Sequence, residues 1–164
     1  MTLLIFTDID GTFINNDTFD EGLNTKTISE LAKAQHSVVF NTSKTFEEVD
    51  YFQKKIKTSL SFICETGGGI YIANDNLKTT ESSRAAYQIL YESRKITEYK
   101  DQIQSEIYKN FRDDLTFFDD LSVEEQSSLS GLSGHDLALA SRRDFSILIK
   151  WQSTKSKYNE FKLF

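Results

Sequence analysis

The sequence contains no proline, a single cysteine and only two histidines, His36 and His135. One cysteine, Cys64, excludes an internal disulfide and supplies too few thiolates for a structural zinc site, so we expect a protein of the reducing cytoplasm. Cys64 lies within an apolar run, where a small buried thiol is more common than a reactive one. Neither histidine lies in a motif, and without proline the turns must rely on Gly, Asn, Asp and Ser.

The sequence also lacks an excess of basic residues and any long hydrophobic run. Because its formal net charge is -6, neither a nucleic acid nor an anionic membrane surface is an expected partner. The apolar opening, residues 1–6, is far shorter than a membrane span or a signal-peptide core. The 164 residues, 13% of them aromatic, suffice for one ordinary ordered domain, or for most of one domain that carries a smaller inserted one.

Short apolar runs alternate with helical patterns in the first half of the chain. Continuous apolar runs of this length are typical of strands buried in a parallel sheet, and they occur at residues 3–6, 38–40, 61–64 and 70–72. An amphipathic spacing predicts a helix over residues 25–35, and the capping box of Thr45 with Glu48 predicts a second over residues 46–57. This alternation predicts an α/β fold with a Rossmann-like parallel sheet, whose loops at the carboxyl ends of the strands face one crevice.

A change in composition after Asn74 predicts a domain boundary. We assign residues 1–78 to the α/β core and residues 79–164 to a second, α+β unit. The expected elements of this second unit are a long helix over residues 85–111, helix starts at Ser122 and Ser133, and a strand over residues 145–149.

The segment Asp8-Ile9-Asp10-Gly11-Thr12 directly follows the first apolar run. Residues two apart at a strand end point their side chains the same way, so Asp8 and Asp10 share one crevice. Such a pair can hold Mg²⁺ through oxygen ligands, while one Asp attacks phosphorus and the other transfers protons. The alternative for an isolated Asp-x-Asp-Gly is a polar turn that ends a strand. A calcium hand is excluded, because Phe13 and Phe19 stand where its loop needs Gly and Glu.

These five residues resemble the first motif of the haloacid dehalogenase superfamily. Residues 39–45 and 62–71 are similar to the second-motif and glycine segments of one branch, the mannosyl-3-phosphoglycerate phosphatases. The resemblance continues into the second unit, where four segments look like the cap domain of that branch: residues 118–121, 124–125, 131–133 and 140–146.

The resemblance implies a Mg²⁺-dependent hydrolase of a phosphorylated sugar or sugar-phosphoglycerate. Asp8 is then the nucleophile that forms an aspartyl-phosphate, Asp10 the general acid and base, and both are metal ligands. The residues that the resemblance assigns to phosphate or substrate are Gly11, Thr12, Thr42, Ser43, Lys44, Gly68, Arg143 and Ser146. It leaves open whether Thr42 or Ser43 binds the phosphate.

Two of these assignments have plain structural alternatives. The three glycines from Gly67 to Gly69 suit a plain hairpin turn as well as a close approach of backbone to ligand. Arg143 suits a solvated helix end as well as a carboxylate or phosphate contact. Ile147 stands where the family pattern has an acidic residue, so recognition of the sugar is not predicted in detail.

Two later motifs of the superfamily, a lysine and an acidic segment, have no counterpart in this sequence, and we expect the chain to stop within the cap. No lysine after residue 149 can take the place of the motif lysine. We therefore expect little or no turnover from this chain alone, and a non-catalytic phosphate- or metal-binding domain, or a decayed relative, is the alternative function. A missing strand predicts an exposed sheet edge after residues 70–72 and a possible homodimer.

Overall fold

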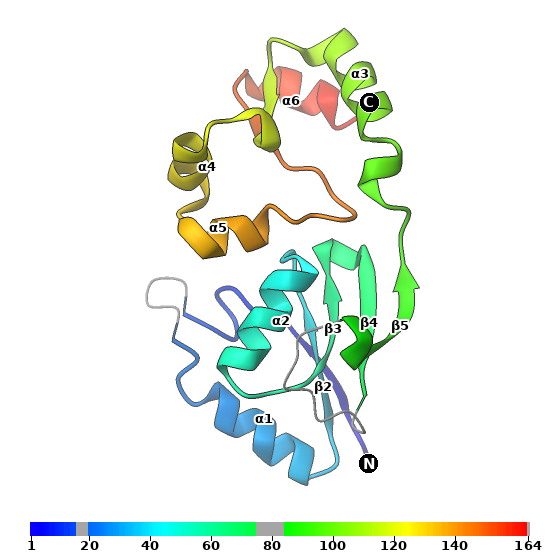
Figure 1. Cartoon of the computed structure of the whole chain (residues 1–164), viewed down its shortest axis with the longest axis vertical. Coiled ribbons are helices and arrows are strands. Elements are labelled where there is room, and N and C mark those ends of the chain that lie inside the picture. The colour runs from blue at the N-terminus through cyan, green and yellow to red at the C-terminus, as the bar shows by residue number, and fades with distance from the viewer. Residues whose placement is uncertain (16–19, 75–83, 164) are drawn as a thin grey trace. The chain divides into compact units, whose positions relative to one another are not determined.

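The alternation of apolar runs and helical segments produces two compact units, Met1–Ser93 and Arg94–Phe164. The structure is a computed structural model, and it describes residues 1–15, 20–74 and 84–163. Figure 1 shows the helices and strands of both units. The predicted boundary at residue 79 lies outside the described residues.

The first unit contains a five-stranded sheet in the order β1-β2-β3-β4-β5. Its strands are β1 (Leu4–Thr7), β2 (Ser37–Asn41), β3 (Ser61–Cys64), β4 (Gly69–Ala73) and β5 (Tyr87–Glu92). The first three strands are parallel, β3 and β4 form an antiparallel hairpin, and β5 pairs antiparallel with β4. The carboxyl ends of β1, β2 and β3 therefore meet at one edge of the sheet, as the sequence predicts.

Two helices, α1 (Asn24–Lys33) and α2 (Phe46–Lys55), begin where predicted to within one residue and end two residues early. The predicted capping box is present at the start of α2. Phe46 of α2 packs against Phe62 of β3, with ring centroids 5.3 Å apart, in the same core cluster as Ile28 of α1. Burying each such aromatic ring stabilises the fold by about 1.5–3 kcal/mol, so this cluster holds both helices on the sheet.

The expected long helix over residues 85–111 is wrong for its first half. A turn of 3₁₀-helix at Arg84–Ala86 leads into β5, and a helix, α3, forms only over Lys100–Phe111. Tyr87 is buried against Phe46 and Phe62, and this burial decides the strand because it requires an extended chain beside β4. With β5 in place, β4 is paired on both sides, so the predicted exposed edge after residues 70–72 is also wrong. Among the described strands, the edges of this sheet are β1 and β5.

The second unit is α+β, as predicted. After α3 come β6 (Leu115–Phe117), α4 (Val123–Ser130), α5 (Gly134–Ala140), β7 (Ile149–Trp151) and α6 (Lys155–Phe161). The capping box of Ser122 with Glu125 begins α4, whereas the Ser133 side chain makes no capping hydrogen bond at the start of α5.

The strand expected over residues 145–149 forms later, as β7. It pairs antiparallel with β6, with Leu115 opposite Trp151. Leu115 and Phe117 are almost fully buried, and Ile147, Ile149 and Trp151 pack against them. The ladder is short because β6 offers only three residues to pair with.

Candidate active site

The loop after β1 carries both predicted carboxylates. Ile9, between them, is fully buried, and its carbonyl oxygen accepts hydrogen bonds from the Phe13 and Ile14 N–H groups at 3.0 and 2.9 Å. Gly11 permits this tight turn because its φ is +69°. The exposed Asp8 side chain accepts a hydrogen bond from the Ile9 N–H at 2.7 Å. The buried Ile9 thus anchors the turn and keeps the Asp8 carboxylate at the surface.

Lys44 lies in the loop after β2. Its side chain contacts both the loop after β1 and the start of α2. Its Nζ lies 3.1 Å from Asp10 Oδ2 and 3.3 Å from Glu48 Oε1. Burial alone lowers the pKa of Lys44, but the carboxylates of Glu48 and Asp10 outweigh it and raise that pKa above the ordinary value. Lys44 is therefore a charged ammonium at neutral pH, held beside Asp10.

Glu48 also belongs to this site, although the sequence predicts for it only a role in capping α2. Its Oε2 accepts a hydrogen bond from the Thr45 N–H at 2.9 Å, while Thr45 Oγ1 accepts one from the Glu48 N–H. Because its Oε1 contacts Lys44, the capping box also holds the ammonium. The signal that points to this role is a lysine four residues before Glu48, the spacing of an ion pair across one helical turn.

Thr42 and Ser43 differ in their access to a ligand. Thr42 is buried, and its Oγ1 accepts a hydrogen bond from the Lys44 N–H at 3.3 Å. Ser43 is exposed. Of the two residues, Ser43 is therefore the more exposed to solvent.

The turn after β3 supports the loop after β2 through its backbone. The N–H groups of Glu65 and Thr66 donate to the carbonyl oxygens of Lys44 and Thr42 at 2.9 and 3.1 Å. Both residues adopt left-handed backbone, with φ of +46° and +58°, which is unfavourable for side chains other than glycine. These hydrogen bonds fix the position of the lysine loop relative to β3.

The Gly68 N–H, predicted to approach a ligand, makes hydrogen bonds inside this turn. It donates to the carbonyl oxygens of Cys64 and Glu65 at 3.0 and 3.2 Å. Cys64 itself is buried, and burial together with the nearby Glu65 raises the pKa of its thiol to about 12. Cys64 is thus a neutral thiol at neutral pH.

Arg143 and Ser146, the predicted substrate residues of the second unit, contact each other. The Arg143 Nε donates a hydrogen bond to Ser146 Oγ at 2.8 Å, and both residues are half-buried. They lie beyond the end of α5 at Ala140, so Arg143 is not at a helix end. The arrangement presents one guanidinium and one hydroxyl as a local pair.

Asp8 and Asp10 supply the oxygen donors that a hard divalent cation prefers. In the described ranges, this loop included, no group of three or more acidic, histidine or cysteine side chains is placed to hold a metal ion. The oxygen donors of Asp8 and Asp10 nevertheless fit Mg²⁺ in kind. The described helices include none that is long and apolar enough to cross a membrane.

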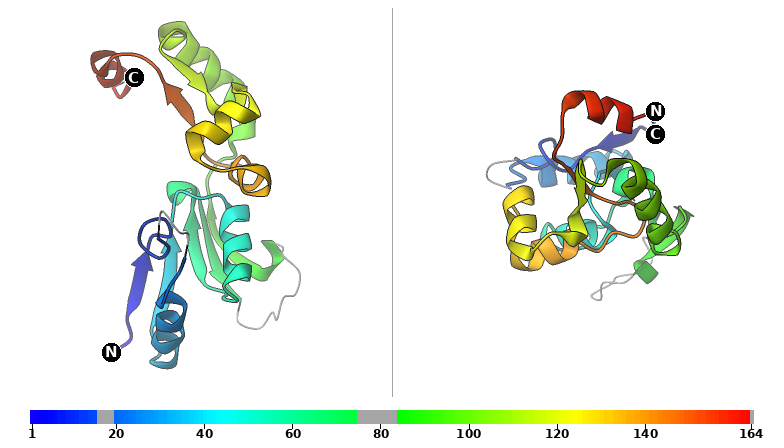
Figure 2. Two further views of the ribbon diagram at one scale, coloured as in Figure 1. Left: turned by 90° about the vertical axis from the view of Figure 1, so that its left-hand side faces the viewer. Right: turned by 90° about the horizontal axis from the view of Figure 1, so that it is seen from above.

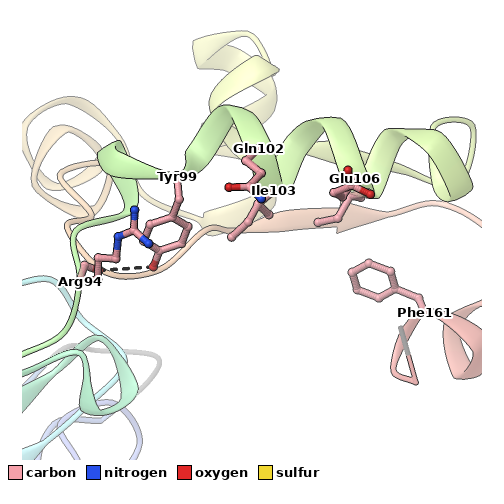
Figure 3. Close-up of a pocket in the computed structure, with 7 residues that line it drawn as sticks. Arg94, Tyr99, Gln102, Ile103, Glu106 and Phe161 are labelled. Carbon is pink, nitrogen blue, oxygen red and sulfur yellow. Dashed lines mark hydrogen bonds between the residues drawn. The ribbon is translucent and has the colours of Figure 1, made fainter.

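The second unit also contains a pocket of about 430 Å³, shown in Figure 3. Its lining residues are Arg94, Tyr99, Gln102, Ile103, Glu106, Ile107 and Phe161. Arg94 lies over the Tyr99 ring and pairs with Glu98, and the Tyr99 hydroxyl donates to the Arg94 carbonyl oxygen at 3.3 Å. None of the predicted site residues lines this pocket.

Sequence comparison finds similarity to one family over most of the chain. Residues 5–133 match the haloacid dehalogenase-like hydrolases. A glucosyl-3-phosphoglycerate/mannosyl-3-phosphoglycerate phosphatase of Persephonella marina is 30% identical over 148 residues, which are 88% of this chain and 53% of that protein. The protein of the same name from Methanococcoides burtonii is 29% identical over 149 residues, or 88% and 54% of the two chains. This chain thus spans about half the length of the curated relatives it matches.

Solved structures share the fold at low sequence identity. A Bacteroides thetaiotaomicron protein, described among the phosphatases of the haloalkanoate enzyme superfamily, matches with a TM-score of 0.62 and 11% identity. The match covers 99% of this chain and 60% of that one. A Thermotoga maritima protein matches with a TM-score of 0.59 and 16% identity, over 98% and 60% of the chains. The predicted α/β fold and the resemblance seen in the motifs are both confirmed.

Proposed function

Because this chain belongs to the haloacid dehalogenase-like hydrolase family, we propose that it carries the nucleophile of a Mg²⁺-dependent phosphatase that acts on a phosphorylated sugar or sugar-phosphoglycerate. The observation that carries this proposal is the 3.1 Å ion pair between Lys44 and Asp10, which brings the cation of the loop after β2 to a carboxylate of the loop after β1. The substrate class follows from the names of the relatives. A cytoplasmic location agrees with the single buried thiol, Cys64.

The substrate phosphate binds first to Lys44 and to the hydroxyl of Ser43. A phosphate dianion attracts an ammonium more strongly than one carboxylate does, so it competes with Asp10 for Lys44. The Glu48 contact keeps the ammonium in the loop while this exchange takes place. Binding of the phosphate thereby releases Asp10 for proton transfer.

The chemistry then has two steps. Asp10, displaced from Lys44 by the phosphate, first takes up a proton from water. A carboxylate oxygen of Asp8 then attacks phosphorus, the bond between phosphorus and the sugar oxygen breaks, and Asp10 donates that proton to the sugar oxygen. Water next attacks the phosphorus of the aspartyl-phosphate and gives a proton to Asp10. The bond between phosphorus and Asp8 breaks, inorganic phosphate leaves, and both aspartates return to their first state.

Asp8 and Asp10 would hold Mg²⁺ through a carboxylate oxygen of Asp8 and the backbone carbonyl oxygen of Asp10. When bound there, the cation supplies positive charge that compensates the phosphate. In the folded loop, the turn around Ile9 keeps the Asp8 carboxylate exposed to such a ligand.

A non-catalytic phosphate-binding domain is the second candidate. It is favoured by one observation: in the part of the chain that the structure describes, no third acidic group joins Asp8 and Asp10. A site with two carboxylates and one ammonium can bind Mg²⁺ and phosphate without completing their chemistry.

Phosphate release from mannosyl-3-phosphoglycerate and a panel of phosphosugars, with Mg²⁺ or with EDTA, tests the proposal. We expect any release to require Mg²⁺ and to fall by about 1000-fold or more in Asp8→Asn, because an amide cannot replace the nucleophile. Asp113→Asn, an exposed aspartate of the second unit, is the control and retains the native rate.

Calorimetry with inorganic phosphate and Mg²⁺ separates the two candidates. Binding without release supports the non-catalytic domain, whereas release that survives Asp8→Asn rejects Asp8 as the nucleophile. A chain that neither binds phosphate nor releases it contradicts both functions.

A further inference from the structure

Asn24, the first residue of α1, contacts the carboxylate loop, which we define as residues 8–15 after β1. Its side-chain Nδ2 donates a hydrogen bond of 2.7 Å to the Phe13 carbonyl oxygen, and Asn24 is half-buried. A carbonyl oxygen only accepts hydrogen bonds, so the amide group is needed here as a donor. The two residues are 11 apart in sequence, and the contact therefore joins the start of a helix to the far end of this loop.

Phe13 is held at three points. Its ring is buried and packs edge to face against Phe40, with ring centroids 5.1 Å apart. Its N–H donates to the Ile9 carbonyl oxygen at 3.0 Å and closes the turn of the loop. Its own carbonyl oxygen is held by Asn24. Because Asp10 lies between Ile9 and Phe13 in the chain, its position depends on both ends of this turn.

A second hydrogen bond joins the carboxylate loop to the segment that precedes α1. The Asn15 N–H donates to the Asp20 carbonyl oxygen at 3.0 Å. Residues 20–23 then lead to the start of α1 in the direction opposite to β1, as Figure 2, left, shows. Of the two contacts, that of Asn24 with Phe13 is closer along the loop to the carboxylates, so it has the larger effect on their position.

The start of α1 gains no side-chain cap of its own. Leu23 occupies the N-cap position, and its side chain makes no capping hydrogen bond. Asparagine is among the best residues at this position and leucine among the poorest, yet the asparagine stands one residue later, where it contacts Phe13. A local preference that is broken beside a candidate site indicates a role in that site.

We propose that Asn24 is a positioning residue for the carboxylate loop. Its amide holds Phe13 and thereby keeps the turn in the conformation that presents Asp8 and Asp10 to Mg²⁺. Groups that orient metal ligands from behind raise the affinity for the metal without being ligands themselves. The inference rests on the proposed function for its ligand, and it adds a residue from α1 to the site.

Calorimetry with Mg²⁺ on the whole chain tests this role through Asn24→Asp. The carboxylate has nearly the size of the amide, but it cannot donate a hydrogen bond and it repels the Phe13 carbonyl oxygen. We expect the Mg²⁺ affinity to fall by about tenfold. The added negative charge by itself would raise the affinity for a cation, so the expected direction is opposite to the electrostatic effect. Asn24→Ala, which removes the donor without adding charge, should show the same fall.

Asn110→Asp is the matched control. The Asn110 Nδ2 also donates to a backbone carbonyl oxygen, that of Glu106 at 3.2 Å, but it lies in the second unit. The variant therefore undergoes the same change in charge and loses a hydrogen bond of the same kind. It should retain the native Mg²⁺ affinity.

Hydrogen exchange measures the loop itself and needs no ligand. The amides of Phe13 and Ile14 both donate to the Ile9 carbonyl oxygen, and they should exchange faster in Asn24→Asp than in the native chain. The Val49 amide, bonded within α2, is the internal reference and should keep its native rate. Faster exchange at all three amides would indicate a general loss of stability and would overturn the positioning role.

The remaining outcomes are also decisive. Unchanged or tighter Mg²⁺ binding in either Asn24 variant overturns the proposal, and so does unchanged exchange of the two loop amides. If the native chain binds neither Mg²⁺ nor phosphate, the proposed function fails, and hydrogen exchange alone then decides whether Asn24 holds the loop.

Discussion

Lys44 is the residue on which the candidate active site depends, because it contacts carboxylates from two different segments. Asp10 belongs to the loop after β1, and Glu48 to the first turn of α2. An ammonium between two carboxylates stays protonated and stays in place. The position of Lys44 is thus set by a helix cap as much as by its own loop.

Glu48→Gln tests this dependence on charge. Gln preserves the capping hydrogen bonds but removes one of the two carboxylates that raise the pKa of Lys44, so we expect that pKa to fall while α2 remains intact. NMR titration of the Lys44 side chain measures the shift. Glu30→Gln, in an exposed pair with Lys26, is the control.

The same charge pairing has a consequence at high pH. A raised folded-state pKa stabilises the fold below the unfolded value of about 10.4, and this contribution is lost as the pH rises through the folded value. The loss should be smaller in Glu48→Gln. An unchanged Lys44 pKa in that variant contradicts the assigned role of Glu48.

The substitution Gly67→Ala tests whether the turn after β3 requires a positive φ. Its φ is +101°, and a Cβ there meets no atom within 4 Å, so the cost of Gly67→Ala is conformational alone. We expect a loss of about 1–2 kcal/mol in the free energy of unfolding, measured by chemical denaturation. Gly131→Ala, at φ +72°, should cost less, because that angle is closer to the left-handed region that other residues can enter. Equal costs would show that φ does not govern this turn.

At the scale of elements, α6 is attached to the rest of the second unit by a buried carboxylate and by Phe161, which packs against Phe111. Asp114 follows α3, and Lys157 Nζ contacts its two oxygens at 2.9 and 3.0 Å. A hydrogen bond from Ser153 and the contact with Lys157 hold the pKa of Asp114 below its ordinary value. The pair joins two segments of the unit that are 43 residues apart in sequence.

Acid should therefore weaken the second unit through Asp114. Because the folded-state pKa lies below the unfolded value of about 3.9, ionised Asp114 stabilises the fold above that value, and this stability is lost as the pH falls through the folded pKa. Fluorescence of Trp151, the single tryptophan, reports this unit. Asp114→Asn should be less stable at neutral pH and lose this part of the acid dependence.

Asp113→Asn provides the comparison for that experiment, since Asp113 is exposed beside Asp114. It should keep the native acid transition. The same transition in Asp114→Asn would show that other carboxylates govern the acid response of the unit.

Helix starts and turns were the elements that the sequence predicted best. The capping boxes at Thr45 and Ser122 depend on residues three apart, and both are present. Strand β5 was missed because its isoleucine, leucine and tyrosines also suit a helix. Only the burial of Tyr87 among rings from α2 and β3 decides between the two.

At the scale of the whole molecule, the chain has the family's fold and about half the length of its curated relatives. Within the described strands, the loop that carries Asp8 and Asp10 follows β1, an edge strand of the sheet.

The sequence by itself determined the local features: the carboxylate loop after β1, the start of α2 and the glycine turn after β3. Each depends on residues within a few positions of one another, where backbone preferences and short hydrogen bonds decide the outcome. Tertiary structure alone decided that Lys44 lies between Asp10 and Glu48. It also decided that β5 pairs with β4, and that Leu4 and Phe6 stay exposed. These features join or separate segments far apart in the chain, and no local preference encodes which distant side chain becomes the neighbour.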